Sequence, residues 1–210
     1  MPALGLSAAI RKASDLGQRA LSLALTKPRM VTPQAHYPSR PHDGILILQK
    51  GDNASTDYYL RPRLPANLPV EIVDIERSHE PRLLRECEAM LVIVCRYICS
   101  GWLADLYDTP QLISRVAFFA DDDLPGMMAD RSLPFAVRGK VAHHYGRYAD
   151  WLSRFSSEVW LSTPALAARY PQARATVLGP VPEADYAAPR LDAPPRVAYH
   201  STDVHAAERL

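Results

Sequence analysis

Short, uninterrupted apolar runs recur through the middle of this 210-residue chain. The clearest are 45–48 (Ile-Leu-Ile-Leu), 91–95 (Leu-Val-Ile-Val-Cys) and 116–120 (Val-Ala-Phe-Phe-Ala). A strand that is apolar at every position has both faces buried, which is typical of a parallel sheet covered by helices. Weaker runs predict three more strands, at 70–75, 159–161 and 175–178.

Helical patterns separate these strands. We predict helices at 79–90, at 103–113, where Pro110 must bend or end the helix, and at 164–170. A longer helix is predicted from five apolar residues that share one face at helical spacing: Val141, Tyr145, Tyr148, Leu152 and Phe155. Strands that alternate with helices predict an α/β fold, a doubly wound, Rossmann-like parallel sheet over residues 44–179.

The first thirty residues carry five basic side chains and one acidic one, a net charge of +4. Their apolar residues recur at roughly helical spacing, which predicts a basic amphipathic helix. Such a helix can lie on an anionic membrane surface, so peripheral contact through residues 1–30 is one interpretation; a transit peptide or a leader without a role are the others. Prolines at 28, 33, 38 and 41 then predict an extended linker, so 1–43 is expected to form a leader and linker.

Five further prolines fall within 180–195 and predict a second linker. The run 196–200 (Arg-Val-Ala-Tyr-His) predicts a strand, and a helix is expected to begin at Val204. Because one strand and part of a helix cannot bury a core, we expect 196–210 to be the start of a truncated second Rossmann-like domain.

Charge and cysteine content exclude several classes of protein. Lys and Arg number 24 against 23 Asp and Glu, so no nucleic-acid partner is expected. No apolar run approaches the ~18 residues of a membrane-spanning helix. The three cysteines, Cys87, Cys95 and Cys99, form no CxxC pair, which favours reduced thiols in a cytoplasmic protein over a disulfide framework or a metal site.

Polar side chains follow the predicted strands, where ligands of doubly wound sheets bind. Asp121, Asp122 and Asp123 come directly after 116–120 and could hold a metal, act as a general base or accept hydrogen bonds from sugar hydroxyls. A turn with an Asp helix cap is the alternative. Arg96, after 91–95, could clamp an anion or pair with these carboxylates.

Two loops offer further candidates. The loop 51–61, which includes Tyr59 and Arg61, is polar and aromatic and could bind a sugar-like acceptor, although an ordinary solvated loop is equally compatible. It lacks the glycine patterns of dinucleotide and P-loop phosphate sites. His200 and Thr202 follow the strand 196–200, where a helix N-terminus could contact phosphate. The adjacent His143 and His144 point about 100° apart on a helix, so a structural role is expected for them.

Five segments, taken in order, carry a family resemblance. They are 58–61 (Tyr-Tyr-Leu-Arg), 91–96 (Leu-Val-Ile-Val-Cys-Arg), 116–124 (Val-Ala-Phe-Phe-Ala-Asp-Asp-Asp-Leu), 158–164 (Glu-Val-Trp-Leu-Ser-Thr-Pro) and 196–202 (Arg-Val-Ala-Tyr-His-Ser-Thr). Over residues 44–210 the chain resembles the N-terminal half of a GT-B-fold glycosyltransferase of the group 1 type.

The resemblance implies transfer of a sugar from a nucleotide-sugar to a glycan or small-molecule acceptor, as in polysaccharide synthesis. No resident cofactor or metal is expected, because helix dipoles and basic side chains stabilise the leaving diphosphate in such enzymes. The catalytic base would be Asp121. The residues that hold the acceptor would be Asp122, Asp123, Arg96, Tyr59 and Arg61, and those on the donor side His200 and Thr202.

The donor domain of that family is not present in the sequence. We therefore expect the chain to be inactive alone and to need a donor-domain chain in trans. A cytoplasmic location, with peripheral contact at the inner membrane face, would suit such an enzyme. The alternative is a non-catalytic Rossmann-like binding or interaction module.

Overall fold

The computed structural model of the chain describes residues 3–77 and 86–181, with side chains from residue 13 onward. The chain divides into two compact units, Met1–Pro180 and Val181–Leu210, and nearly all described residues belong to the first. The predicted strand at 196–200, the helix from Val204, and both His200 and Thr202 lie outside the described residues. The predicted linker 180–195 also lies almost wholly outside them.

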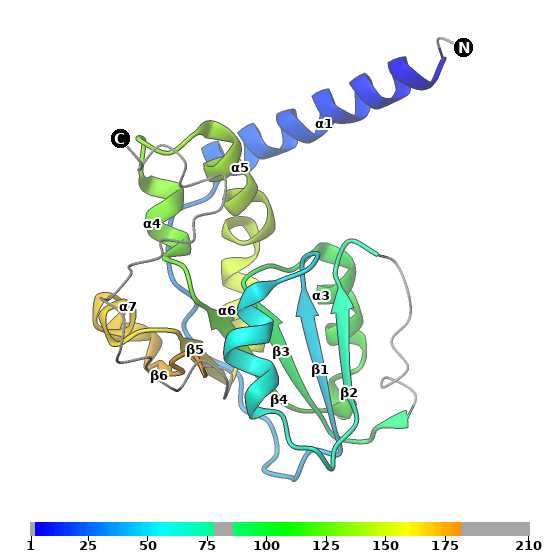
Figure 1. The fold of residues 1–210 in the computed structure, drawn as a ribbon, viewed down its shortest axis with the longest axis vertical. Coiled ribbons are helices and arrows are strands. Elements are labelled where there is room, and N and C mark those ends of the chain that lie inside the picture. Colours follow the sequence, from blue (N-terminus) through cyan, green and yellow to red (C-terminus); the bar gives the residue numbers. More distant parts are fainter. Residues whose placement is uncertain (1–2, 78–85, 182–210) are drawn as a thin grey trace, which may run out of the picture. The chain divides into compact units, whose positions relative to one another are not determined.

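The described residues form a six-stranded, all-parallel open sheet (Figure 1). Its strands are β1 (Gly44–Gln49), β2 (Val70–Asp74), β3 (Met90–Cys95), β4 (Ile113–Ala120), β5 (Glu158–Leu161) and β6 (Thr176–Val177). The strand order is β2-β1-β3-β4-β5-β6, so the direction of winding reverses at β1. The predicted α/β fold with a Rossmann-like parallel sheet is confirmed, and all six predicted strands are present with small shifts at their ends.

The reversal at β1 places the helices unevenly on the two faces. Right-handed crossovers put connections that run in opposite directions on opposite faces of a sheet. The helices that follow β3 therefore share one face: α3 (Ser100–Asp108), α4 (Leu124–Ala129), α5 (Phe135–His144), α6 (Ala149–Phe155) and α7 (Pro164–Arg169). Among the described residues, the opposite face is covered mainly by the connection from β1 to β2, which contains the π-helix η1 (Thr56–Leu60) and the 3-10 helix η2 (Arg61–Arg63).

Two hydrophobic cores result, one on each face of the sheet. Leu46, Val92 and Phe118 point toward the helical layer and pack with residues of α3 to α7. Their chain neighbours Ile47 and Ile93 point the other way and pack with the aromatic and aliphatic side chains of the η1–η2 connection. This alternation explains why the runs 45–48, 91–95 and 116–120, in β1, β3 and β4, are apolar at every position, as the sequence indicated.

Two helix predictions need correction, and a third falls mostly outside the described residues. The helix predicted at 103–113 ends at Asp108, because Pro110 starts a separate 3-10 turn and β4 begins at Ile113. The helix predicted at 79–90 falls mostly outside the described residues, and Met90 is already the first residue of β3.

The long helix predicted through Val141 and Phe155 is in fact two helices. It is interrupted after α5 by the 3-10 turn Gly146–Tyr148, before α6 begins. A Cβ atom on Gly146 would lie 2.5 Å from Cε of Met128, so another residue at this position would require the Met128 side chain to move. The apolar stripe predicted burial correctly, since four of its five residues are buried, but not the continuity of the helix.

The N-terminal helix α1 (Ala3–Leu25) is present as predicted, and no helix in the described residues is long and apolar enough to cross a membrane. The proline-rich segment 26–43 is extended, and it packs on the helical layer. Met30 and Val31 are buried, Gln34 N donates to Ser153 O at 2.9 Å, and the Tyr145 hydroxyl donates to Arg29 O at 2.6 Å. The N-terminal segment is thus part of the folded unit rather than a free linker.

We expect Tyr145→Phe to lower the free energy of unfolding by about 1 kcal/mol, because the variant keeps the ring and loses the hydrogen bond to Arg29 O. Urea unfolding measures the change. The matched control is Tyr107→Phe, whose ring is exposed and which should change stability by less than about 0.5 kcal/mol. Equal stability of Tyr145→Phe and the wild type would show that this bond does not hold the N-terminal segment.

Candidate functional site

Polar side chains converge at the carboxyl edge of the sheet, where the winding reverses between β1 and β3. Ligands of doubly wound sheets bind at such a switch point. Five residues from the loops after β1, β3 and β4 meet there: Asn53, Ser55, Arg96, Asp121 and Asp122. We call this group the edge cluster.

Arg96 is the centre of the edge cluster. Its Nη1 donates to Asp122 Oδ2 at 2.9 Å and its Nη2 to Asn53 Oδ1 at 2.7 Å, while Nε lies 3.6 Å from Asp121 Oδ1. Its backbone adopts the left-handed conformation, with φ of 65°, and its N–H donates to Phe119 O on β4. This conformation costs a non-glycine residue about 1–2 kcal/mol, so the polar contacts hold Arg96 in a strained position.

Asp121 is the most enclosed carboxylate of the edge cluster. Oδ2 accepts a hydrogen bond from the Ser55 hydroxyl at 2.6 Å, and Oδ1 is buried without a hydrogen-bond partner, facing Arg96 Nε. Burial raises the pKa of Asp121, and Asp122 raises it further, against the opposing effect of Arg96. Asp121 therefore retains a proton more readily than an ordinary carboxyl group.

Asn53 and Ser55 complete the edge cluster; the sequence indicated only the polar loop 51–61 that contains them. Asn53 Oδ1 accepts from Arg96 and from Ser55 N–H at 3.1 Å, and its Nδ2 donates to Cys95 Sγ at 3.2 Å. Burial raises the pKa of Cys95 to about 11, so this thiol is not a nucleophile near neutral pH. Their position directly after the first strand was the signal that could have identified both residues.

The predicted acceptor residues divide into two groups. Arg96 and Asp122 belong to the edge cluster, and Tyr59 lies beside it, with its ring 5.3 Å from that of Phe119 and its pKa raised by burial and by Asp121 and Asp122. Arg61 is exposed and pairs with Asp57 at 2.6 Å instead. Being four residues apart on a short helical segment, these two form a local ion pair.

Asp123 has the capping role that the sequence left open. Its Oδ1 accepts from Gly126 N–H at 2.9 Å at the start of α4, and its Oδ2 pairs with Arg169 at 2.6 Å. Tyr170 donates a further hydrogen bond to Oδ1. The carboxylate thus joins α4 to the end of α7 and makes no contact with Arg96.

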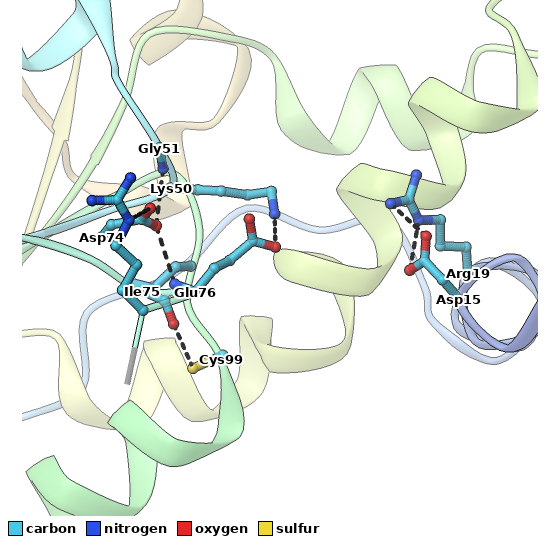
Figure 2. Close-up of polar contacts among 9 residues, drawn as sticks. Asp15, Arg19, Lys50, Gly51, Asp74, Ile75, Glu76 and Cys99 are labelled. Atoms are coloured by element: carbon cyan, nitrogen blue, oxygen red, sulfur yellow. Dashed lines mark hydrogen bonds and ion pairs between the residues drawn. The ribbon is translucent and has the colours of Figure 1, made fainter. Parts of the chain in front are cut away.

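Asp74, the last residue of β2, fixes the loop that leads from β1 to Asn53. Asp74 Oδ1 accepts from Gly51 N–H at 3.0 Å and from Glu76 N–H at 3.1 Å, as Figure 2 shows. Gly51 has φ of 59°, a conformation that favours glycine. The Gly51 hydrogen bond is the main cause of a lowered pKa of Asp74. Lys50 and Glu76 form an ion pair across the same two loops.

Within residues 3–77 and 86–181, no three His, Cys, Asp or Glu side chains converge in a way that could hold a metal ion. Comparisons with protein-family models, curated proteins and solved structures find no match to this chain. Statements about its chemistry therefore depend on the geometry of the site itself.

The opposite pKa shifts of Asp121 and Asp74 predict opposite effects of pH on the stability of the fold. The raised pKa of Asp121 means that the folded state holds a proton the unfolded state has lost, so the contribution of Asp121 to stability falls as pH rises above the ordinary value of 3.8. Asp121→Asn cannot titrate. We expect the stability of the wild type relative to this variant to decrease from pH 4 to pH 7, measured by urea unfolding.

Asp74→Asn is the matched control. Because the folded-state pKa of Asp74 is lowered, its contribution to stability is lost as pH falls below 3.8, so the wild type should lose stability relative to this variant in acid. If Asp121→Asn and the wild type keep a constant difference in stability over the whole range, Asp121 does not titrate as the geometry indicates.

Proposed function

We propose that this chain is the acceptor-side domain of a glycosyltransferase, with Asp121 as the general base. One observation carries the proposal: Asp121 Oδ2 already accepts a hydrogen bond from an alcohol, the Ser55 hydroxyl at 2.6 Å, at the ligand-binding edge of the sheet. A sugar hydroxyl has the same chemistry and the same donor geometry. The order of motifs along the sequence supports the same assignment.

The reaction assigns a distinct role to each group. An acceptor hydroxyl, joining or displacing Ser55 at Asp121 Oδ2, would give its proton to that oxygen while its own oxygen attacks the anomeric carbon of the donor. The bond from that carbon to the nucleotide diphosphate breaks, and the electron pair leaves with the diphosphate. A raised pKa brings Asp121 closer to neutral pH, which favours proton transfer. Arg96 keeps the carboxylates paired before and after the transfer.

The other predicted residues fit this proposal to different degrees. Tyr59 borders the edge cluster and is placed to contact an acceptor, whereas Arg61 and Asp123 are held by other partners. The donor would be bound by His200 and Thr202 with a donor-domain chain in trans.

Helix α1 exposes Leu16, Leu21 and Leu25, which supports peripheral contact with an anionic membrane and a membrane-bound acceptor.

A non-catalytic binding module is the second candidate, and one observation favours it. Asp121 Oδ1 is buried against Arg96, and Oδ2 is covered by Ser55, so the carboxylate is enclosed by the loops around it. In that function Asp121 is a positioning residue that holds Arg96 and Ser55. A ligand would bind over Asp122, whose side chain is 43% exposed, without chemical change.

The two candidates differ in the effect of Asp121→Asn. The full chain is combined with a donor-domain chain, a panel of labelled nucleotide-sugars and glycan acceptors, and transfer is measured. General-base catalysis contributes about 10²–10⁴-fold, so Asp121→Asn should lower turnover by that range with little change in acceptor KM.

Asp57→Asn is the matched control, because it makes the same change in an exposed carboxylate outside the edge cluster. It should retain turnover. Full turnover in Asp121→Asn would exclude Asp121 as the base. Acceptor binding without transfer under any combination, measured on a glycan array, would favour the binding module.

A further inference from the structure

A pocket lies between α3 and α6, two helices on the same face of the sheet (Figure 1). Helix α3 lines it with one stripe at helical spacing, which runs from Ser100 to Tyr107 and Asp108; Tyr148, in the 3-10 turn before α6, and Trp151 of α6 line the other side. We call it the α3–α6 pocket. Its volume of about 340 Å³ lies within the range of small-molecule sites. None of its lining residues belongs to the edge cluster.

Three aromatic side chains form much of the wall of this pocket. Tyr148 is buried, whereas Tyr107 and Trp151 are 66% and 46% exposed, so two large rings remain open to solvent. Phe155 contacts both of the exposed rings. Its ring lies edge-on to that of Tyr107 at 6.2 Å and stacks on that of Trp151 at 6.3 Å. The positions of the two exposed rings are therefore fixed by packing before any ligand binds.

The charge at the pocket is negative. Asp108 is the only charged side chain that lines it, and in the described part of the chain its carboxylate has neither a hydrogen bond nor an ion pair. It is also the last residue of α3, whose last turn contains no basic residue. The C-terminus of a helix carries partial negative charge, so a carboxylate there is unfavourable unless a cation is near. The pocket thus favours a cationic ligand.

Two of the pocket's rings already attract cations of this chain. The guanidinium of Arg147 lies 4.9 Å from the centre of the Tyr148 ring, and that of Arg154 lies 5.6 Å from the centre of the Trp151 ring. Neither arginine lines the pocket. An aromatic ring attracts a ligand cation by the same interaction. The aromatic wall and Asp108 therefore favour the same sign of charge in the ligand.

The lining also indicates which kind of cation would bind. Within residues 3–77 and 86–181 no three His, Cys, Asp or Glu side chains converge on a metal ion. A primary ammonium group would bring three N–H donors into a pocket whose surface is mainly apolar, and unpaired donors are costly to bury. A methyl-substituted ammonium group has no such donors and presents apolar methyl groups to the aromatic rings.

From this arrangement we propose that the α3–α6 pocket binds an organic cation of the quaternary ammonium class. Its methyl groups contact Tyr107, Tyr148 and Trp151, and Asp108 balances its charge. The ammonium group can belong to a soluble compound or to a lipid headgroup. The proposal does not depend on Asp121 or on sugar transfer, so it can fail without affecting the proposed function.

An NMR titration of the full chain with choline tests the proposal, and 3,3-dimethyl-1-butanol, the uncharged isostere of choline, is the matched probe. The indole N–H signal of Trp151 should shift with choline, while that of Trp160 stays in place, because Trp160 packs on the opposite face of the sheet. Choline should bind about fivefold more tightly than the isostere, because only choline gains the attraction of a charge to the rings. This comparison uses only the wild type, so it does not depend on the folding of a variant.

Asp108→Asn should weaken the binding of choline about threefold and leave that of the isostere unchanged, because it removes one exposed charge. Asp105→Asn is the matched control: it makes the same change in the same turn of α3 but outside the pocket, and it should bind choline as the wild type does. Equal affinity of the wild type for choline and its isostere would overturn the proposal, as would a Trp151 signal that neither probe shifts.

Sedimentation with vesicles identifies the source of the cation. Binding to phosphatidylcholine vesicles that excess choline displaces assigns a lipid headgroup. Binding of choline by a chain that phosphatidylcholine vesicles do not sediment assigns a soluble compound.

Discussion

The right-handedness of crossovers in a parallel sheet, combined with one reversal of winding at β1, determines where everything else lies. The reversal sends the β1–β2 connection to one face and the connections after β3 to the other. It also separates the loops after β1 and β3, so that a space opens between two neighbouring strands. Side chains from three loops fill that space and form the edge cluster. The position of the candidate site thus follows from the strand order and from the handedness of the connections.

Within the edge cluster, the guanidinium of Arg96 is shared between two carboxylates, those of Asp121 and Asp122. The lack of a second cation determines how readily Asp121 holds a proton. Arg96 bonds directly to Asp122 and Asn53 and approaches Asp121 only at 3.6 Å. A second cation would pair Asp121 fully and lower its pKa; without one, burial has the larger effect and raises it. The left-handed turn at Arg96 keeps this imbalance fixed, because it directs the side chain toward the loops after β1 and β4.

The sequence predicts the centre of the sheet well because β1, β3 and β4 each carry their own signal, a run that is apolar at every position, whereas β2, β5 and β6 carry weaker runs. It predicts the long apolar stripe from Val141 but not its interruption, because the close approach of Gly146 to Met128 is a tertiary contact. It identified Arg96 and Asp121 individually, and Asn53 and Ser55 only as members of the polar loop 51–61. The contacts of Asn53 with Arg96 and of Ser55 with Asp121 depend on β1, β3 and β4 lying side by side, which only the strand order shows.

The connection after β3 links the edge cluster to the helical layer. Arg96 belongs to the edge cluster, and two residues later Ile98 N–H donates to His144 O at 3.1 Å, at the end of α5. Between them lies Tyr97, whose buried ring is approached by Arg96 and by Lys140, each at 5.6 Å, and faces His144. The segment that holds Arg96 in its strained conformation is therefore anchored to α5 as well as to the loops after β1 and β4.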